Sequence, residues 1–235
     1  DNRTNGNIYL IGDSHAAQLT FALQSVAKKR KVDFYFINTE SQDEYPNSFW
    51  RKSVTTDKLL EYLLSVSSAN DYFVTSFHRG HLNPRRDSHY PKDRLLAFSG
   101  KAEMFLMNME RYLPKFQKKG INVVLVKDGP LLNDIDTTIE ACMFRYVNDG
   151  VSSCRIAYNK DNDTRFLQSA IFDELARKYF NTSTIDFLPE LYDDGFFSPI
   201  SSNGEYLMFD RHHLTENASL SLIDFFDAKI IPQNR

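Results

Sequence analysis

Two short groups of residues, one near each end of the chain, carry the side chains that nucleophilic catalysis needs. Residues 12–15, Gly-Asp-Ser-His, follow the apolar run 8–11, and residues 210–214, Asp-Arg-His-His-Leu, stand near the other end. A serine in a sharp turn between a strand and a helix lies beside free backbone N–H groups, which favour a developing negative charge. An Asp three residues before a His supplies a base and a carboxylate to orient it. The two groups together predict covalent chemistry on Ser14, as in serine hydrolases and acyltransferases.

Each residue of these groups also has a purely structural interpretation. Ser14 could cap the following helix, with Asp13 adding favourable charge at the same end. Asp210 and His213 could be a hydrogen-bonded pair that holds a loop. His212, which is closer to Asp210 in the sequence, is the alternative base. Because the serine and the Asp-x-x-His group occur in one chain, we favour a catalytic interpretation of both.

The order and spacing of these motifs resemble those of the SGNH (GDSL-like) hydrolase superfamily over nearly the whole chain. Residues 12–16, Gly-Asp-Ser-His-Ala, and 209–215, Phe-Asp-Arg-His-His-Leu-Thr, most resemble the SGNH domains fused behind multi-pass membrane acyltransferases, which O-acylate cell-surface glycans. The resemblance implies that Ser14 is the nucleophile, His213 the general base and Asp210 its orienting carboxylate. It also implies that the Ser14 N–H group is one oxyanion donor.

The chain departs from the superfamily at two places that usually supply further oxyanion donors. The superfamily has a Gly after the second strand, whereas residues 38–50 contain no Gly. Its Gly-x-Asn block would fall near residues 71–79, where the chain has Ser-Phe-His and no Asn at that spacing. His78, Arg79 or Asn83 could replace the missing donors. These departures keep open a third class of function, a catalytically silent domain that binds a glycan or a partner.

A loop after the third predicted strand is a candidate for substrate binding. Residues 78–89 hold three of the six His residues and three Arg residues, in a stretch that contains Gly and Pro. We favour a substrate-binding loop at the end of a central strand, with Arg79 and His81 as the contacting side chains. A metal site, a polyanion-binding patch and an ordinary solvated loop are the alternatives.

Other candidates for substrate binding lie elsewhere in the chain. His15 follows Ser14 and is expected at the rim of the pocket. A role at the protein surface is equally compatible with its position in the sequence. Trp50, the only Trp, stands in the loop after the second predicted strand and could stack on a sugar ring. The aromatic residues within 192–206 could serve the same purpose or pin their loop to the core.

The resemblance implies an O-acyltransferase, with acetyl as the favoured group and a sugar hydroxyl of a cell-surface polysaccharide or lipopolysaccharide as acceptor. The acyl group would come from acetyl-CoA through a membrane acyltransferase domain in the same polypeptide, so no metal or nucleotide cofactor is expected. The domain would be extracytoplasmic, tethered to the membrane by a part outside this sequence, and monomeric when isolated. A free-standing secreted carbohydrate or lipid esterase with the same three residues is the alternative enzyme.

Length and composition limit these interpretations. The chain has 235 residues, of which 42% are hydrophobic and 14% aromatic, enough for one sizeable core. No Gly/Ser-rich or Pro-rich linker divides it, so residues 1–235 are expected to form one domain. The net charge of −3 gives no indication of nucleic-acid binding. No apolar run approaches the ~20 residues of a membrane span. No signal-peptide pattern is expected within these residues, and the start at Asp1 suggests a processed chain or an excised piece.

Two cysteines indicate the redox environment. Cys142 and Cys154 bracket a polar, turn-rich stretch without a Cys-x-x-Cys pair, which favours a loop or hairpin closed by a disulfide over a metal site. Such a bridge would contribute about 3 kcal/mol in the chain-entropy model and would persist outside the cytosol. Two buried free thiols are the alternative.

The hydrophobic pattern alternates strands with helices, which predicts an α/β fold, a three-layer α/β/α sandwich with a mostly parallel central sheet. The run 121–126 is rich in β-branched residues, as in a strand buried on both faces, and Gly120 would end the preceding helix. The expected strands are 8–11, 32–37, 72–77, 121–126 and 184–187, and the expected helices are 16–31, 57–66, 95–118, 164–179 and 215–228. Residues 135–156 and 189–207 are expected to be long irregular connections.

Overall fold

The computed structural model describes residues 6–39, 54–79, 82, 100–130, 139–150, 154–157 and 165–230. Three of the candidate site residues, Trp50, His81 and Asn83, lie outside the described residues. The other candidate residues can be placed in the fold.

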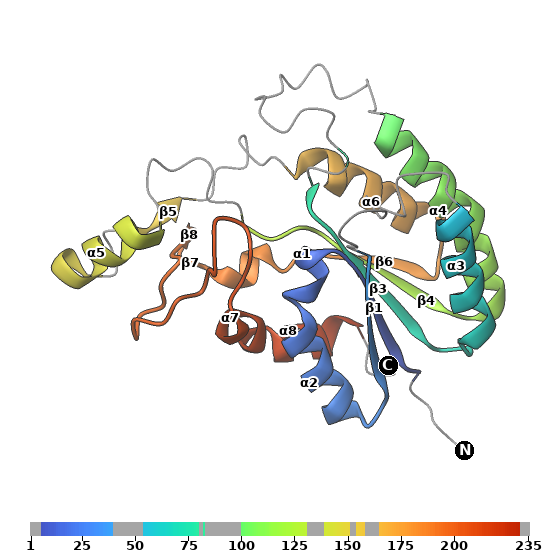
Figure 1. Ribbon diagram of the computed structural model, residues 1–235, viewed down its shortest axis with the longest axis horizontal. Coiled ribbons are helices and arrows are strands. Elements are labelled where there is room, and N and C mark those ends of the chain that lie inside the picture. The colour runs from blue at the N-terminus through green and yellow to red at the C-terminus, as the bar shows by residue number, and fades with distance from the viewer. Residues whose placement is uncertain are drawn as a thin grey trace.

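The fold is built on a central sheet of five strands in the order β2-β1-β3-β4-β6 (Figure 1). The strands are β1 (Ile8–Gly12), β2 (Phe34–Asn38), β3 (Tyr72–Ser76), β4 (Asn122–Val126) and β6 (Thr182–Ile185). Every neighbouring pair is parallel, and Gly12 at the end of β1 lies beside both Asn38 and Ser76. The predicted parallel sheet is confirmed, and all five strands end at the same edge.

Helices cover both faces of this sheet. One face is covered by α2 (Thr20–Arg30), α7 (Glu216–Ser221) and α8 (Ile223–Ile230), and the other by α3 (Val54–Val66), α4 (Gly100–Lys119) and α6 (Phe166–Lys178) (Figure 1). Because side chains alternate along a strand, Ile8 and Leu10 of β1 pack into the first core, and Tyr9 and Ile11 into the second. This is the three-layer α/β/α sandwich that the sequence predicts.

Two helices predicted as continuous are each divided. The helix predicted over 16–31 consists of α1 (Ser14–Ala17) and α2, with the buried residues Gln18 and Leu19 between them. The helix predicted over 215–228 is divided into α7 and α8 at Leu222, which is also buried. At both breaks tertiary packing overrides the local preference for a continuous helix.

A helix is also present in the first of the two predicted irregular connections. This helix is α5 (Ile139–Asp149). Cys142 and Tyr146 face a small apolar cluster, whereas Phe144 and Val147 are each 72% exposed. The prediction is wrong here, because Ile139, Cys142, Met143 and Tyr146 recur at helical spacing and face apolar clusters, a regular period that the sequence analysis does not use.

The second predicted irregular connection contains short regular elements. A turn of 3-10 helix, η5 (Leu188–Leu191), is followed by β7 (Tyr192–Asp193) and β8 (Phe196–Phe197). These two strands form a small antiparallel sheet with β5 (Ile156–Ala157), which comes earlier in the chain. The predicted disulfide is present and joins Cys142 to Cys154, although Cys142 lies on α5 rather than in a loop. In Figure 1, α5 and this small sheet lie to one side of the central sheet.

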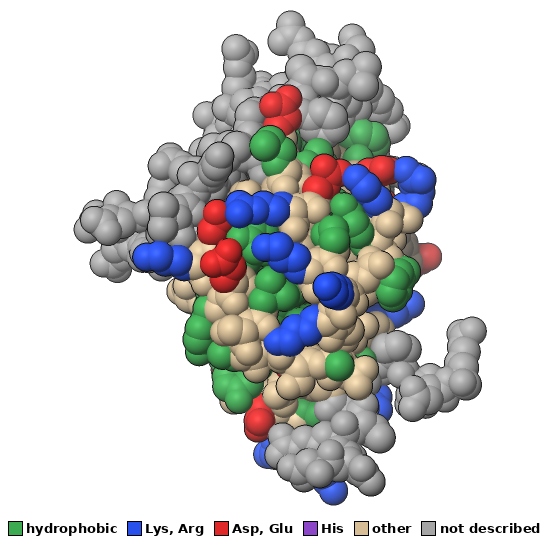
Figure 2. Space-filling view, turned by 90° about the vertical axis from the view of Figure 1, so that its right-hand side faces the viewer, with side chains coloured by type: hydrophobic (Ala, Val, Ile, Leu, Met, Phe, Trp, Pro, Cys, Tyr) green, Lys and Arg blue, Asp and Glu red, His purple; other side chains and the backbone are tan. Residues whose placement is uncertain are grey.

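The side of the molecule that carries α3 and α4 presents charges of both signs. In Figure 2, Lys and Arg side chains (blue) are interspersed with Asp and Glu (red) and with apolar side chains (green). One ion pair, Arg111 with Asp57 at 2.9 Å, joins α4 to α3. None of the helices in the described ranges combines the length and the apolar character needed to cross a membrane.

Candidate active site

The candidate site lies at the edge of the sheet where the parallel strands end. Strands β1, β3 and β4 are neighbours, and they lead into Asp13, His78 and Asp128, respectively. Because the carboxyl ends of parallel strands meet at one edge, residues far apart in sequence come together here.

The turn after β1 packs directly against the end of β3. Gly12 has a φ of +156°, and a Cβ at this position would lie 1.9 Å from the carbonyl oxygen of Ser76. It would also lie 2.7 Å from the Cβ of Ala16. No side chain fits at this position, so the motif needs Gly before the Asp-Ser pair.

Asp13 holds the serine turn to the end of β3. Its Oδ1 accepts a hydrogen bond from His15 N–H at 2.8 Å, which caps α1. Its Oδ2 accepts a hydrogen bond from His78 N–H at 2.9 Å. The helix cap is therefore Asp13 rather than Ser14, and the Ser14 hydroxyl is left for other contacts.

Ser14, His213 and Asp210 form a continuous chain of hydrogen bonds. His213 Nε2 lies 2.9 Å from Ser14 Oγ, and His213 Nδ1 lies 2.7 Å from Asp210 Oδ2. With the Nδ1 proton donated to Asp210, Nε2 carries the lone pair that can accept the Ser14 proton. The structure thus brings together the three residues that the two sequence motifs singled out, in a geometry suited to proton transfer.

The loop that carries Asp210 also orients it. Asp210 Oδ1 accepts the N–H groups of His212 and His213, both at 2.8 Å, which leaves Oδ2 for the His213 ring. Partial burial opposes the charged carboxylate, but the hydrogen bonds from His212 and His213 outweigh it and lower the pKa of Asp210 to about 2. Asp210 is therefore ionised throughout the neutral range.

His212, the alternative base, lacks this arrangement. Its Nδ1 lies 3.7 Å from Asp210 Oδ1, and within the described residues this nitrogen has no hydrogen-bond partner. Burial lowers the pKa of His212, and the neighbouring charge of His213 lowers it further. The geometry favours His213 over His212 as the base for Ser14.

Gln18 ties the loop of His213 to the serine helix, and the sequence analysis did not single it out. Its Oε1 accepts the N–H group of Leu214 at 2.6 Å. Within the loop, Phe209 N–H donates to the carbonyl oxygen of His213 at 2.8 Å. Gln18 stands four residues after Ser14, about one helical turn. This spacing places the two residues on the same side of a helix and is the feature of the sequence that could have identified Gln18.

Two of the predicted oxyanion donors have other partners. The N–H group of His78 donates to Asp13, as described above. The N–H and Nε groups of Arg79 both donate to Asp128 Oδ2, each at 2.9 Å, and Arg79 is only 8% exposed. The predicted substrate contact of Arg79 is therefore corrected, because Arg79 is buried against Asp128 and joins the ends of β3 and β4. The Ser14 N–H group has no acceptor in the described part of the chain.

His15, expected at the rim of a pocket or in a surface role, is buried instead, with 1% of it exposed. Its Nδ1 lies 2.6 Å from Oδ1 of Asp128, which is completely buried and also accepts Gly129 N–H at 2.8 Å. Burial opposes the charge of Asp128, but His15 and Arg79 outweigh it and hold the pKa of Asp128 well below its usual range. The observed position of His15 differs from the expectation because the strand order brings the end of β4, with Asp128, against α1, which carries His15.

Four imidazole rings gather around this point. The ring centroid of His15 lies 4.6 Å from that of His78, 5.2 Å from that of His212 and 4.8 Å from that of His213. Nitrogens of His15, His212 and His213 lie within 4.8 Å of one another, a spacing at which three ligands could approach a cation. However, His15 Nδ1 and both nitrogens of His213 already form hydrogen bonds, which a cation would displace. The arrangement suits proton transfer and charge stabilisation better than metal binding.

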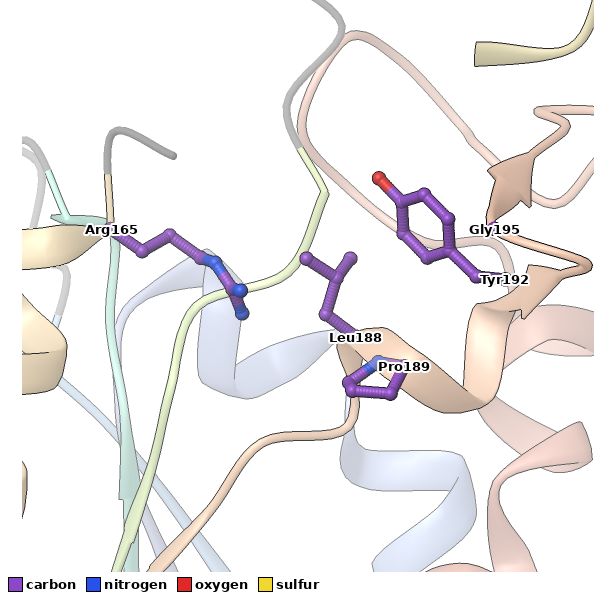
Figure 3. Close-up of a pocket in the computed structure, with 5 residues that line it drawn as sticks. All are labelled: Arg165, Leu188, Pro189, Tyr192 and Gly195. Carbon is purple, nitrogen blue, oxygen red and sulfur yellow. The ribbon is translucent and has the colours of Figure 1, made fainter. Parts of the chain in front are cut away.

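A pocket of about 280 Å³ adjoins the buried network. Its lining residues, shown in Figure 3, are Arg165, Leu188, Pro189, Tyr192 and Gly195. Arg165 and Tyr192 lie on opposite sides of Leu188 in this view. Tyr192 is one of the aromatic residues that the sequence suggests could stack on a sugar ring. Arg165 Nη1 donates to the carbonyl oxygen of Asp128 at 3.1 Å and to Asp186 Oδ1 at 2.8 Å. Arg165 thus links the pocket to Asp128, and no signal in the sequence pointed to it.

The parallel α/β sandwich and the placement of Ser14, His213 and Asp210 at its carboxyl edge define the chain as a protein of the SGNH type. Residues 1–228 match the model of the family described as SGNH domain (fused to AT3 domains). The chain belongs to this family, and the resemblance stated from the motifs is confirmed.

Solved structures show the same fold at low sequence identity. The periplasmic domain of a lipopolysaccharide acetyltransferase of Salmonella ser. Paratyphi A has a TM-score of 0.64 and 15% identity, over 97% of this chain and 85% of that one. Protein YXIM of Bacillus subtilis has a TM-score of 0.52 and 17% identity, over 96% of this chain and 56% of that one. No curated protein sequence matches the chain.

Proposed function

We propose that this chain is a serine-dependent O-acyltransferase that transfers an acetyl group to a sugar hydroxyl of a cell-surface polysaccharide or lipopolysaccharide. The observation that carries the proposal is the hydrogen-bonded chain from Ser14 Oγ to His213 Nε2, 2.9 Å, and from His213 Nδ1 to Asp210 Oδ2, 2.7 Å. A serine, a base and an orienting carboxylate at these distances are the groups that carry acyl transfer through a covalent intermediate in serine hydrolases.

In the first step the Ser14 oxygen attacks the carbonyl carbon of the acyl donor. His213 Nε2 takes the Ser14 proton, and the carboxylate of Asp210 stabilises the resulting imidazolium. The tetrahedral intermediate collapses, and the leaving group departs with the proton from His213. The product of this step is an acyl ester on Ser14.

In the second step the acyl ester is transferred to the acceptor. A sugar hydroxyl gives its proton to His213 Nε2 as its oxygen attacks the acyl carbon. The intermediate then releases Ser14, which regains a proton from His213. Water in place of the sugar would make the same site an esterase.

The family supports the proposed acyl donor and location. Its description places SGNH domains in fusion with AT3 domains, and one structural neighbour is the periplasmic domain of a lipopolysaccharide acetyltransferase. We therefore propose that a membrane acyltransferase domain in the same polypeptide supplies acetyl groups derived from acetyl-CoA, and that this domain works outside the cytoplasm as a monomer without a resident cofactor. The disulfide between Cys142 and Cys154 fits such a compartment.

Incubation with p-nitrophenyl acetate, followed by intact-mass measurement, tests the proposal. The wild type is expected to show a burst of nitrophenol and a transient adduct of one acetyl group. Ser14→Ala and His213→Ala are expected to show neither. Ser65→Ala, which changes an exposed serine on α3, is the matched control and is expected to behave as the wild type.

The acceptor decides between transferase and esterase. Surface oligosaccharides are added to the acetylated protein, and acetyl transfer is measured against hydrolysis. Transfer to sugar supports the proposal, whereas an adduct that is resolved only by water supports the esterase instead. A wild type that forms no adduct and turns over no ester contradicts acyl chemistry on Ser14 and favours a binding domain.

A further inference from the structure

We propose that His15 and Asp128 form a second Asp–His pair of the active site, in which the charged His15 ring donates a hydrogen bond to the oxyanion formed at Ser14. This inference rests on the proposed function, because the oxyanion forms only when Ser14 attacks an acyl group. It supplies a donor in a chain whose sequence lacks the Gly and the Asn that are usual in the superfamily.

The second pair repeats the bonding of the first. Asp128 Oδ1 lies 2.6 Å from His15 Nδ1, and Asp210 Oδ2 lies 2.7 Å from His213 Nδ1. The Asp128 carboxylate also accepts Gly129 N–H and two N–H groups of Arg79, which prevent it from turning away. His15 Nδ1 therefore carries a proton that it donates to Asp128, and Nε2 is the nitrogen left for another contact.

The surroundings of His15 favour its charged form. Burial alone favours the neutral ring and Arg79 repels a positive charge, but the carboxylates of Asp128 and Asp13 outweigh both, so the pKa of His15 is raised from its ordinary value. The other titratable groups against the ring are His78, His212 and His213. In the charged form both ring nitrogens are donors, so Nε2 presents an N–H group.

The His15 ring lies beside the reacting atoms. It belongs to the residue after Ser14, and its centroid is 4.8 Å from that of His213, whose Nε2 is 2.9 Å from Ser14 Oγ. Within the described ranges, the side-chain hydrogen bond of His15 is the one between Nδ1 and Asp128. The Nε2–H group is thus available to an atom of a bound substrate.

The competing donors at this edge of the sheet are less suited to an oxyanion. The N–H group of His78 donates to Asp13, and the N–H and Nε groups of Arg79 donate to Asp128. His212 has a lowered pKa, which favours its neutral ring. Between His15 and His212, His15 is the imidazole whose charged form a carboxylate partner stabilises.

His15 keeps its proton throughout this step. As Ser14 Oγ bonds to the carbonyl carbon, the carbonyl electron pair moves onto oxygen and the Ser14 proton moves to His213. His15 donates from Nε2 to the new oxyanion, together with the Ser14 N–H group. The bond is released when the C=O double bond forms again. Because the negative charge exists only near the transition state, a charged donor there raises the rate more than the affinity.

Acylation kinetics of His15→Gln test the inference, because Gln keeps a polar side chain and removes the charge. Acylation of Ser14 by p-nitrophenyl acetate is expected to slow by about 10²–10³-fold with little change in KM. His78→Gln, at the competing imidazole, is expected to slow acylation by less than about tenfold. Thermal unfolding of both variants shows whether the fold is kept.

The pH profile separates a charged donor from a merely structural role. Acylation needs a charged His15, so the wild-type profile of kcat/KM is expected to have an alkaline limb, where His15 loses its proton. His15→Gln is expected to lose this alkaline limb. A structural role for His15 would lower the whole profile and leave its shape unchanged.

The outcomes separate this inference from the function on which it rests. A wild type without a Ser14 adduct contradicts the proposed function, and the inference with it. A wild type that acylates while His15→Gln acylates within about threefold of it, or keeps the alkaline limb, overturns the role of His15 alone. If His15→Gln does not fold, nitrogen NMR of the wild type decides. Two protonated nitrogens on His15 near neutral pH support the inference, and a neutral ring overturns it.

Discussion

Gln18 and Leu214 connect the two parts of the candidate active site by one hydrogen bond. Gln18 Oε1 accepts Leu214 N–H at 2.6 Å, although the two residues are 196 positions apart in the chain. Gln18 follows α1, the short helix that begins at Ser14, and Leu214 follows His213. The bond therefore helps to set the distance between the nucleophile and its base. Both residues are buried, where water competes little for the bond.

Gln18→Met removes the acceptor and nearly keeps the volume. We expect the free energy of unfolding to fall by about 1–3 kcal/mol, because Leu214 N–H is left buried without its partner. The acylation rate is expected to fall by about 10–100-fold as the base loses its position. Denaturant unfolding and single-turnover acylation measure the two effects. Gln24→Met on the exposed side of α2 is the control, and equal effects of both changes would contradict the role of Gln18.

Asp210→Asn tests the orientation of His213. An amide can turn its NH₂ group toward Nδ1, which leaves Nε2 protonated and unable to accept the Ser14 proton, so we expect acylation to slow by about 10²–10⁴-fold. Because the pKa of Asp210 is about 2, its protonation is not expected to shape the wild-type profile above about pH 4. Stopped-flow acylation measures the rate. Asp224→Asn on α8, with a side chain 94% exposed, is the control.

Gly12→Ala tests the close packing of the serine turn. The new Cβ would lie 1.9 Å from the carbonyl oxygen of Ser76, so the turn or β3 must move, and we expect a loss of about 3 kcal/mol or more in unfolding free energy. Gly150→Ala is the control. Gly150 has a φ of +84° but no atom within 4 Å of an added Cβ, so only the backbone strain of about 1–2 kcal/mol is expected. Similar losses at both positions would show that steric contact is not the cause.

The stability contributed by His15 is expected to depend on pH. The raised pKa means that the folded protein binds the His15 proton more tightly than the unfolded chain does. This contribution is complete below the pKa of an unfolded His, about 6.5, and is lost as the pH rises through the higher folded pKa. The difference in unfolding free energy between wild type and His15→Gln should therefore shrink as the pH rises above about 6.5.

His212→Gln provides the opposite trend. The pKa of His212 is lowered in the folded protein, so protonation of His212 opposes folding. The wild type should lose stability relative to His212→Gln as the pH falls below the pKa of an unfolded His, about 6.5. Denaturant unfolding at several pH values measures both series. A parallel pH dependence of the two variants would contradict the opposite pKa shifts.

Much of the fold could be predicted from the sequence because its signals are local. The β-branched run before Lys127 is β4, and Gly120 ends α4 with a φ of +74° as predicted. The helix α5 also carries a local signal, since Ile139, Cys142 and Tyr146 stand at helical spacing and face apolar clusters, but the polar, turn-like residues after it favour a loop in the sequence. The breaks at Gln18 and Leu222 were missed because they depend on packing against other elements.

The candidate site divides in the same way. Local sequence was enough to identify the serine turn and the Asp210–His213 loop, because the turn needs Gly12 and three positions separate the Asp from the His within one loop. The partners of His15 and the placement of Arg79 emerged only from the folded chain. Asp128 is 113 positions from His15, and no local pattern indicates which strand ends become neighbours. Whether a charged residue at the end of a strand is solvated or buried depends on which strands lie next to it and which helices cover it. The order of the strands and the placement of the helices are properties of the whole fold.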